Sequence, residues 1–259
     1  AGARETIAFP VGLRDRLEEL ARAEGATLYM VLLAAFQVLL FRCSGSDDLV
    51  VGSPIAGRTR AEVEELVGFF VNTLVLRTDL SGDPTFREVL RRVRTTTLGA
   101  FEHQEVPFEK LVEELQPERS LSHTPLVQVI FSLREGVAAE LAHTGLDAVA
   151  LDVHTDTAKF DLALAVDTVE SGLRGELAYA TDLFDAETIR RMLARLGRVL
   201  EEAAADPDRR LSALELLPDA EREFLASVGG WNRTEAAHFA GACIHRLFEA
   251  RAVRTPDAV

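Results

Sequence analysis

Cysteine and basic charge are both scarce in this chain of 259 residues. The two cysteines, Cys43 and Cys243, stand far apart and outside any Cys-x-x-Cys pattern, which excludes a disulfide scaffold and argues against a zinc site. Free thiols are typical of the reducing cytoplasm, so we expect a cytoplasmic protein. Lysine and arginine total 28 against 42 acidic residues, a net charge of −14, which argues against a nucleic-acid partner.

Long hydrophobic runs and a secretory signal are absent as well. The longest apolar stretch runs from Leu28 to Phe41 and includes Gln37. It falls short of the about 20 residues that a bilayer-spanning helix needs, so it predicts a helix in a protein core and no membrane partner. The N-terminus shows no basic segment followed by an apolar one.

The motifs of common catalytic and nucleotide-binding sites are also missing. There is no Gly-x-x-x-x-Gly-Lys, no Gly-x-Gly-x-x-Gly, no Gly-x-Ser-x-Gly and no His-Glu-x-x-His. No histidine is adjacent to another in the set of six, which comprises His103, His123, His143, His154, His238 and His245. The sequence therefore predicts no metal site and assigns no catalytic residue.

Hydrophobic periodicity predicts a mixture of helices and strands. Helices are expected at 11–24, 28–41, 86–101, 107–115 and 185–205, and strands at 49–52, 69–80, 126–133, 160–166 and 173–179. Thr27, Thr85 and Asp185 stand where helix N-caps are needed, and Glu88 completes a capping box with Thr85. Strands and helices do not alternate regularly, so we expect an α/β fold of mixed α+β layers that ends near Leu211.

Three segments, and a loop ahead of them, are distinctive. The loop is Gly52-Ser53-Pro54-Ile55-Ala56-Gly57-Arg58, and the segments are 67–77 (VGFFVNTLVLR), 103–111 (HQEVPFEKL) and 119–131 (RSLSHTPLVQVIF). Any one of them alone is a weak signal. In this order and spacing they closely resemble the downstream motifs of condensation domains in nonribosomal peptide synthetases, from about Thr6 to Leu211.

The C-terminal residues carry a second resemblance. Trp231-Asn232-Arg233-Thr234 and the segment 243–249 are similar to the linker and first helix of an adenylation domain, the usual neighbour after a condensation domain. We therefore expect a condensation-type lobe at 1–211, a linker at 212–241 and the truncated start of an adenylation domain at 242–259. The chain starts without Met and stops inside this last region, so we expect that both ends are cut from a longer protein.

The resemblance implies the fold of chloramphenicol acetyltransferase, in which two similar lobes enclose a tunnel. The family's catalytic motif, His-His-x-x-x-Asp-Gly, belongs to the N-terminal lobe, and this sequence contains neither His-His nor Asp-Gly. The chain therefore resembles the C-terminal lobe, a mixed β-sheet flanked by helices. Such a lobe supplies the tunnel floor, a latch at 134–157 and part of a carrier docking surface.

The implied reaction is amide-bond formation between aminoacyl or peptidyl thioesters. The substrates arrive on the phosphopantetheine arms of carrier proteins, so no cofactor is expected on the chain itself. The implied partners are the N-terminal lobe of the same domain, the upstream and downstream peptidyl carrier proteins, and the adjacent adenylation domain. Because half a tunnel aligns neither reactant well, we expect the chain alone to be inactive.

Five polar residues are candidates for the substrate tunnel, namely Ser53, Arg58, Asn72, Gln104 and Ser132. Four of them have a structural alternative. Ser53 and Arg58 flank a loop that the resemblance places near the tunnel floor, and the alternative is a plain turn. Asn72 either orients substrate or bonds to a nearby loop, and Ser132 either faces the tunnel or is an ordinary sheet residue. His103, which precedes Gln104, is interpreted as a helix-end residue that bonds backbone carbonyls.

Two rows of arginines have helical spacing. They are Arg87, Arg91 and Arg94 on one predicted helix, and Arg191, Arg195 and Arg198 on another. Such rows are candidates for docking an acidic carrier protein and its phosphate. The alternative is a solvated helix face with local salt bridges.

Two other functions stay open. The chain is alternatively a non-catalytic protein-interaction module, which binding of a non-carrier partner would indicate. It is alternatively an epimerisation domain of the same superfamily, although such domains usually close a module and the adenylation-like tail argues against this. A stand-alone acyltransferase would need a general base of its own.

Overall fold

The computed structural model describes residues 1–117, 124–135, 156–227 and 243–256. The chain forms two compact units, Ala1–Leu216 and Leu217–Val259. The second unit contains α8 (Asp219–Ser227) and α9 (Ile244–Arg254). The start of the third distinctive segment (119–123), most of the predicted latch and the Trp231–Thr234 motif lie outside the described residues.

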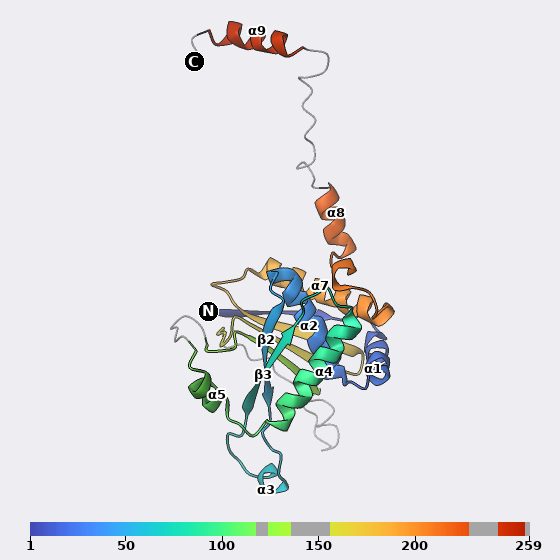
Figure 1. Ribbon diagram of the computed structural model, residues 1–259, viewed down its shortest axis with the longest axis vertical. Helices are drawn as coiled ribbons and strands as arrows, with labels where there is room; N and C mark the ends of the chain where they lie inside the picture. Colours follow the sequence, from blue (N-terminus) through green and yellow to red (C-terminus); the bar gives the residue numbers. More distant parts are fainter. Residues whose placement is uncertain (118–123, 136–155, 228–242, 257–259) are drawn as a thin grey trace. The chain divides into compact units, whose positions relative to one another are not determined.

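A mixed β-sheet of six strands forms the centre of the first unit (Figure 1). The strands are β1 (Gly2–Ala8), β2 (Asp48–Ile55), β3 (Asn72–Asp79), β4 (Val129–Glu135), β5 (Leu162–Val169) and β6 (Gly172–Ala180). Their order across the sheet is β1-β6-β5-β4-β2-β3. The strand β4 runs parallel to both of its neighbours, β2 and β5, and the other neighbouring pairs of this sheet are antiparallel. Among the strands that the structure describes, β1 and β3 are therefore the edges of the sheet.

One face of the sheet is covered by long helices (Figure 1). They are α1 (Leu13–Ala23), α2 (Leu28–Ser44), α4 (Phe86–Glu102) and α7 (Ala186–Ala205). The helix α2 contacts the other three helices as well as β2 and β4, and every residue from Met30 to Leu39 is buried. This confirms the prediction of a central core helix, because a helix that is apolar on all sides must be surrounded by protein.

Hydrogen bonds at the predicted N-caps fix where these helices begin. The Thr27 hydroxyl accepts from the Met30 amide at 3.3 Å, and the Asp185 carboxylate accepts from the Thr188 amide at 2.7 Å. The predicted capping box at the start of α4 is also present. These caps satisfy amide groups that the first turn of a helix leaves without partners.

The strands alternate between large residues toward the helices and small or polar residues on the other side. On β5, Leu162, Leu164 and Val166 are buried against the helices, whereas Ala163 and Ala165 point the opposite way. We call this opposite side the far face of the sheet. The predicted fold class, an α/β fold with a mixed sheet flanked by helices, is confirmed.

Some local predictions were wrong. The strand β1 was missed because its sequence, GARETIA, is poor in β-branched and aromatic residues. The strand β3 begins at Asn72, not at residue 69, and the side chain of Phe69 is 90% exposed. No residue of α5 (Phe108–Leu115) is buried, although its spacing predicted a buried face. The short helices α3 (Ala61–Glu64) and η1 (Leu211–Ala213) complete the first unit.

Within the described part of the chain, no single helix combines the length and apolar character needed to cross a membrane. The helices α1 and α2, taken together, pass that test as a pair bent by 102°. Since α2 is buried among the other helices, its apolar character is accounted for by the core of the first unit.

Candidate functional site

The structure places Gly52 and Ser53 within β2, which extends to Ile55, so the predicted loop begins later than expected, and Gly52 is closely packed by its neighbours. A Cβ atom on Gly52 would lie 2.6 Å from the Val127 side chain and 2.7 Å from that of Ile130, so glycine is needed for β2 and β4 to approach each other. Ser53 is buried and hydrogen-bonds the phenol of Tyr29. Burial raises the pKa of Tyr29, an effect that the Ser53 bond opposes. Ser53 thus points to the helix-covered face and anchors α2 to β2.

Arg58 holds the connection between β2 and β3 together. Its guanidinium donates to the carbonyls of Val63 and Glu64 at the end of α3, the latter at 3.1 Å, and lies 4.5 Å from the centre of the Phe70 ring. Gly57 has φ +65°, and a Cβ there would collide with the Phe70 carbonyl. These contacts give Arg58 a structural role, and its predicted contact with substrate stays a prediction.

Asn72 ties the second distinctive segment to the edge of the sheet. Its amide nitrogen donates to the carbonyls of Gln104 and Val106, at 3.0 and 2.8 Å. Its amide oxygen accepts from the backbone N–H groups of Thr73 and Phe108, at 2.9 and 3.0 Å. The loop alternative for Asn72 is therefore realised in the structure, and these four bonds use its donors and both acceptor directions.

His103 ends α4, as predicted. It is the C-cap residue, and its Nδ1 lies 2.9 Å from the carbonyl oxygen of Gly99, one turn earlier. The backbone carbonyl of its neighbour Gln104 receives the Asn72 bond. Within the described residues, no group of three or more His, Cys, Asp or Glu side chains is arranged to hold a metal ion.

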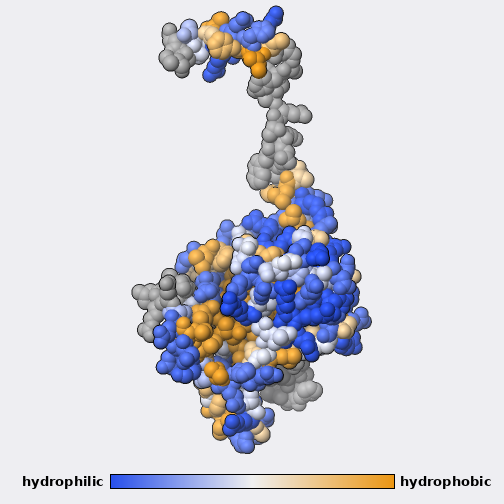
Figure 2. All heavy atoms as spheres, in the orientation of Figure 1, coloured by the Kyte–Doolittle hydropathy of each residue, from blue (hydrophilic) through white to orange (hydrophobic). Residues whose placement is uncertain are grey.

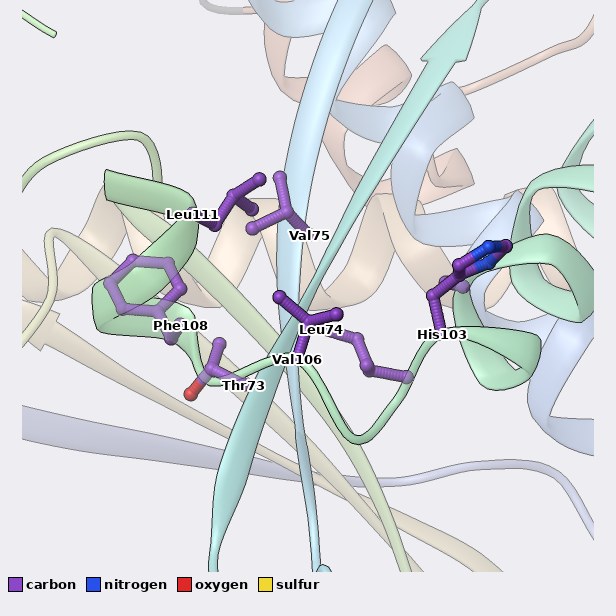
Figure 3. A pocket seen from close by; sticks show the side chains of 8 residues that line it. Thr73, Leu74, Val75, His103, Val106, Phe108 and Leu111 are labelled. Atoms are coloured by element: carbon purple, nitrogen blue, oxygen red, sulfur yellow. The ribbon is translucent and has the colours of Figure 1, made fainter. Parts of the chain in front are cut away.

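A pocket of about 220 Å³ lies where α4, the 103–108 loop and α5 meet the edge strand β3 (Figure 3). Its lining is mostly apolar and comprises Thr73, Leu74, Val75, Ala100, His103, Val106, Phe108 and Leu111. Figure 2 shows apolar side chains gathered between α5 and β3. The clamp by Asn72 shapes this pocket, because it fixes the carbonyl of Val106 and the amide of Phe108.

Ser132 lies on the far face, apart from Ser53 and Asn72. In the β4–β5 register it pairs with Ala165, on the side away from the helices. Farther along β4, Arg134 makes a bidentate ion pair with Asp167, at 2.7 and 3.0 Å. The structure therefore does not bring the predicted tunnel residues together on one surface of the first unit.

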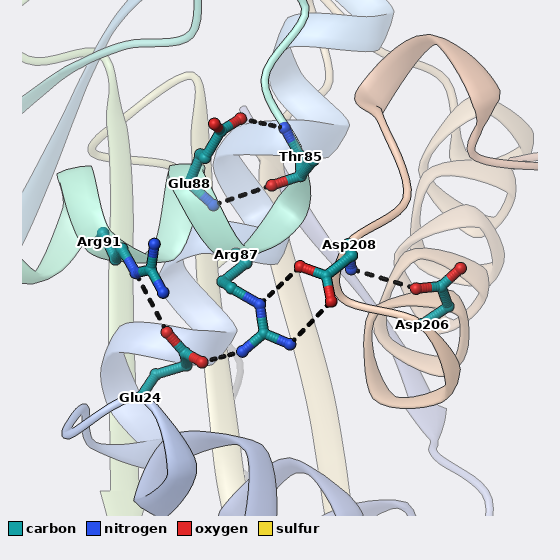
Figure 4. A network of polar contacts seen from close by, with 7 residues as sticks. All are labelled: Glu24, Thr85, Arg87, Glu88, Arg91, Asp206 and Asp208. Carbon is teal, nitrogen blue, oxygen red and sulfur yellow. Dashed lines mark hydrogen bonds and ion pairs between the residues drawn. The ribbon is translucent and has the colours of Figure 1, made fainter.

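The arginines of α4 are engaged within the lobe (Figure 4). Arg87 binds Asp208 through two bonds of 2.6 and 3.0 Å and also pairs with Glu24, while Arg91 binds Glu24 at 3.2 Å. The Glu24 side chain is only 7% exposed. Arg94 donates to the Gly25 carbonyl at 2.7 Å. This row thus joins the ends of α1, α4 and α7.

On α7, Arg191 and Arg198 bond to neighbours on the same helix. Arg198 pairs with Glu201 and Glu202 of the same helix, at 2.9 and 3.3 Å. The exposed Arg191 donates to the hydroxyl of Thr188 at 3.2 Å, and Arg195 is half-buried. The salt-bridge alternative is realised for Arg198, and carrier docking by either row stays a prediction.

Sequence reasoning missed two contributors to this region. Tyr29 bonds Ser53, and its ring centre lies 5.3 Å from that of Phe131. A single tyrosine within an apolar helix gave a usable signal, because a buried phenol needs a polar partner. Asp208 was missed because its partner Arg87 is remote in sequence, and no local pattern links them.

Comparison with known proteins places this geometry in a family. A model of the family described as Condensation domain matches residues 1–226. A linear gramicidin synthase protein of Brevibacillus parabrevis is 47% identical over 258 residues, covering 99% of this chain and 3% of the relative. Surfactin synthase subunit 1 of Bacillus subtilis is 38% identical, covering 99% and 7%. The chain therefore spans only a small part of these relatives.

Solved structures agree with this result. A holo four-domain nonribosomal peptide synthetase bound to AMP and glycine matches with a TM-score of 0.78 and 27% identity, covering 86% of this chain and 18% of that one. The X-domain in its complex with OxyB from teicoplanin biosynthesis matches with a TM-score of 0.75 and 34% identity, covering 85% and 49%. Sequence and structure together establish that this chain belongs to the condensation-domain family.

Proposed function

We propose that this chain is the C-terminal lobe of a condensation domain that forms amide bonds in nonribosomal peptide synthesis. The proposal is supported by how much of each matched protein this chain spans. Residues 1–226 match the family, yet the chain spans 49% of the X-domain structure. The absence of a His-His-x-x-x-Asp-Gly motif supports it, because that motif belongs to the other lobe.

The reaction requires a base, and His103 is the one histidine that the structure describes in the first unit. The acceptor amine attacks the donor thioester carbonyl, a C–N bond forms, the C–S bond breaks, and the amine proton must be removed. Both substrates are carried on phosphopantetheine arms of carrier proteins. His103 caps a helix, and its Nδ1 already contacts a backbone carbonyl. We therefore assign the base to the N-terminal lobe, and tunnel alignment to the two lobes together.

An exposed apolar segment offers a surface for that partner lobe. The connection between β2 and β3 leaves large apolar side chains half or more exposed, namely Leu66, Val67, Phe69 and Val71. Figure 2 shows apolar side chains around the tip of this connection. Apolar side chains gathered at a surface are typical of interaction sites. This contact would place Arg58 and Phe70 close to the boundary between the lobes.

The remaining partners follow from the domain order. Upstream and downstream peptidyl carrier proteins would deliver the substrates, with the arginine rows of α4 and α7 as docking candidates. Residues 242–259 would begin the adenylation domain, after a linker at 212–241. Ser132 pairs with Ala165 on the far face of the sheet and stays a tunnel candidate. The free thiols of Cys43 and Cys243 agree with a cytoplasmic enzyme.

A condensation assay tests the proposal. Two carrier proteins are loaded with aminoacyl thioesters, and the dipeptidyl carrier is followed by mass spectrometry. We expect product when this chain is mixed with the separately expressed upstream half, and none from either half alone. Product from this chain alone would contradict the proposal and direct attention to His103. An assembled pair that makes no product would also contradict it.

A non-catalytic interaction module is the second candidate. It is favoured by the similarity to an X-domain that was solved in a complex with OxyB. In that case the assembled halves would bind a non-carrier protein and leave loaded carriers unchanged. An epimerase would instead invert the α-carbon of one carrier-bound residue without joining two. Chiral analysis of the same reaction mixtures separates these three outcomes.

A further inference from the structure

Among the residues that the structure describes, no strand pairs with the outer side of β3, the last strand in the sheet order. The amide of Leu80 bonds toward the β2 side, so the even-numbered residues of β3 face β2 and the odd-numbered ones face outward. Outward-facing carbonyls near the end of β3 are bonded by α4. The main-chain carbonyl of Arg77 accepts from the Thr96 hydroxyl at 3.2 Å, and the main-chain carbonyl of Asp79 accepts from the Arg92 guanidinium at 2.7 Å.

In the middle of this edge, main-chain amides and carbonyls lack hydrogen-bond partners among the described residues. At its start, the Thr73 amide is bonded by the Asn72 side chain. Four main-chain groups from Thr73 to Arg77 form no hydrogen bond with the residues that the structure describes. They are the Thr73 carbonyl, the Val75 amide, the Val75 carbonyl and the Arg77 amide. Donors and acceptors in a row along a strand edge are a template for another extended chain.

The apolar pocket lies beside these same groups. Figure 3 shows β3 passing between α5, with Phe108 and Leu111, and the end of α4, with His103. An extended peptide paired with β3 would direct alternate side chains toward α5 and toward the end of α4, because successive side chains of a strand point to opposite faces. The volume of about 220 Å³ suits a short segment rather than a whole domain.

The surroundings of the pocket are acidic. Glu102 and Glu109 are exposed and have no ion pair within the described part of the chain. Glu105 pairs with Arg60 at 3.6 Å, and Lys110 pairs with Glu113 at 3.0 Å. The excess negative charge favours a ligand with basic residues beside its apolar ones.

We propose that the edge of β3 binds a short extended peptide segment of a partner protein by adding a strand to the sheet. The main-chain groups of Thr73, Val75 and Arg77 supply the hydrogen bonds, the pocket takes an apolar side chain, and Glu102 and Glu109 attract flanking basic residues. This site does not depend on the condensation activity, so its failure and that of the proposed function are separable.

Peptide binding to the 259-residue chain tests this site. The probes are acetylated, amidated pentapeptides of sequence Arg-X-Thr-X-Arg, with X as Val, Ile, Leu or Phe. We expect millimolar or tighter binding for at least one, with backbone amide exchange at Val75 and Arg77 slowed about tenfold. N-methylation at alternate peptide positions should abolish binding in one set and spare it in the other, since alternate amides face β3.

Variants of the pocket provide the matched controls. Val75→Pro removes an outward amide that is not part of the β2 ladder, and edge strands tolerate proline at such positions. Ala100→Phe fills the pocket from α4 and leaves β3 unchanged. Both should weaken binding at least tenfold, whereas Val75→Thr should retain it.

Three results would overturn the proposal. The first is no peptide binding at millimolar concentration. The second is binding that survives both Val75→Pro and Ala100→Phe. The third is tighter binding of free pantetheine at the same amides, which would assign the edge to a carrier tether.

Discussion

The helix-covered core and the connection between β2 and β3 are both rich in large apolar side chains, yet only the core buries them. Phe86 on α4 is 0% exposed, whereas Phe69 in the connection is 90% exposed. The core is complete because α2 and the sheet surround it from within the same lobe. The contrast teaches that apolar sequence alone does not predict burial, which also depends on the surfaces that pack around each side chain.

Removal of one phenylalanine side chain from each region should give the largest difference in stability between the two regions. Phe86→Ala leaves a cavity in the core and should lower the free energy of unfolding by about 3–5 kcal/mol. Phe69→Ala should change it by less than about 0.5 kcal/mol. Urea unfolding followed by circular dichroism measures both. Equal losses would show that the connection is folded into the lobe after all.

Glu24→Gln tests the ionic junction of α1, α4 and α7. It removes the shared partner of Arg87 and Arg91 at a nearly buried position and should cost about 2–3 kcal/mol in unfolding free energy. The matched control is Glu18→Gln, which loses a half-exposed pair with Arg14 and should cost at most about 0.5 kcal/mol. If both variants unfold at the same urea concentration, the junction contributes no more than a surface pair.

Asn72→Ala should cost about 1–3 kcal/mol, because it leaves the carbonyls and amides of the 104–108 loop without their partner. Hydrogen exchange should accelerate at Phe108 and remain slow in α2. Asn72→Asp retains acceptors for the two amides and loses the donors, so exchange at Phe108 should be less affected than in the alanine variant. Uniform acceleration throughout the lobe would contradict a local clamp.

The smallest expected effect is a dependence of the unfolding free energy on pH in the acidic range. Arg87 holds the pKa of Asp208 below its usual value. This stabilisation is complete above the unfolded-state pKa, about 3.9, and is lost as the pH falls through the lower folded-state pKa. Thermal unfolding between pH 6 and 2 should therefore show a shallower fall for Asp208→Asn than for the parent chain. Parallel curves would contradict this role for Asp208.

Local patterns predicted the core better than the site. The caps at Thr27, Thr85 and Asp185 and the buried α2 depend on residues close in sequence, so periodicity and capping rules identified them. Pairing between remote segments was not predictable in this way. The Asn72 clamp was foreseen only as one of two alternatives, and the link from Arg87 to Asp208 leaves no local sequence signal.

The strand β1 and the helix α5 show the limits of propensity. The strand β1 has few strand-favouring residues and forms because β6 offers an antiparallel neighbour. The sequence of α5 places apolar residues on one face of the helix, yet Leu115 is 59% exposed. Tertiary context decides both cases, and in α5 the apolar spacing contributes to a pocket wall instead of a core.

If the chain is the C-terminal lobe proposed above, it should bind a separately expressed N-terminal lobe of a condensation domain, and this association is the most direct test of the account. Isothermal titration calorimetry should give a one-to-one complex with a micromolar or tighter dissociation constant. Phe69→Ser should weaken this binding at least tenfold while leaving the unfolding curve of the isolated chain unchanged. Failure of the parent chain to bind, or equal binding by Phe69→Ser, would contradict the proposal that the β2–β3 connection binds an N-terminal lobe.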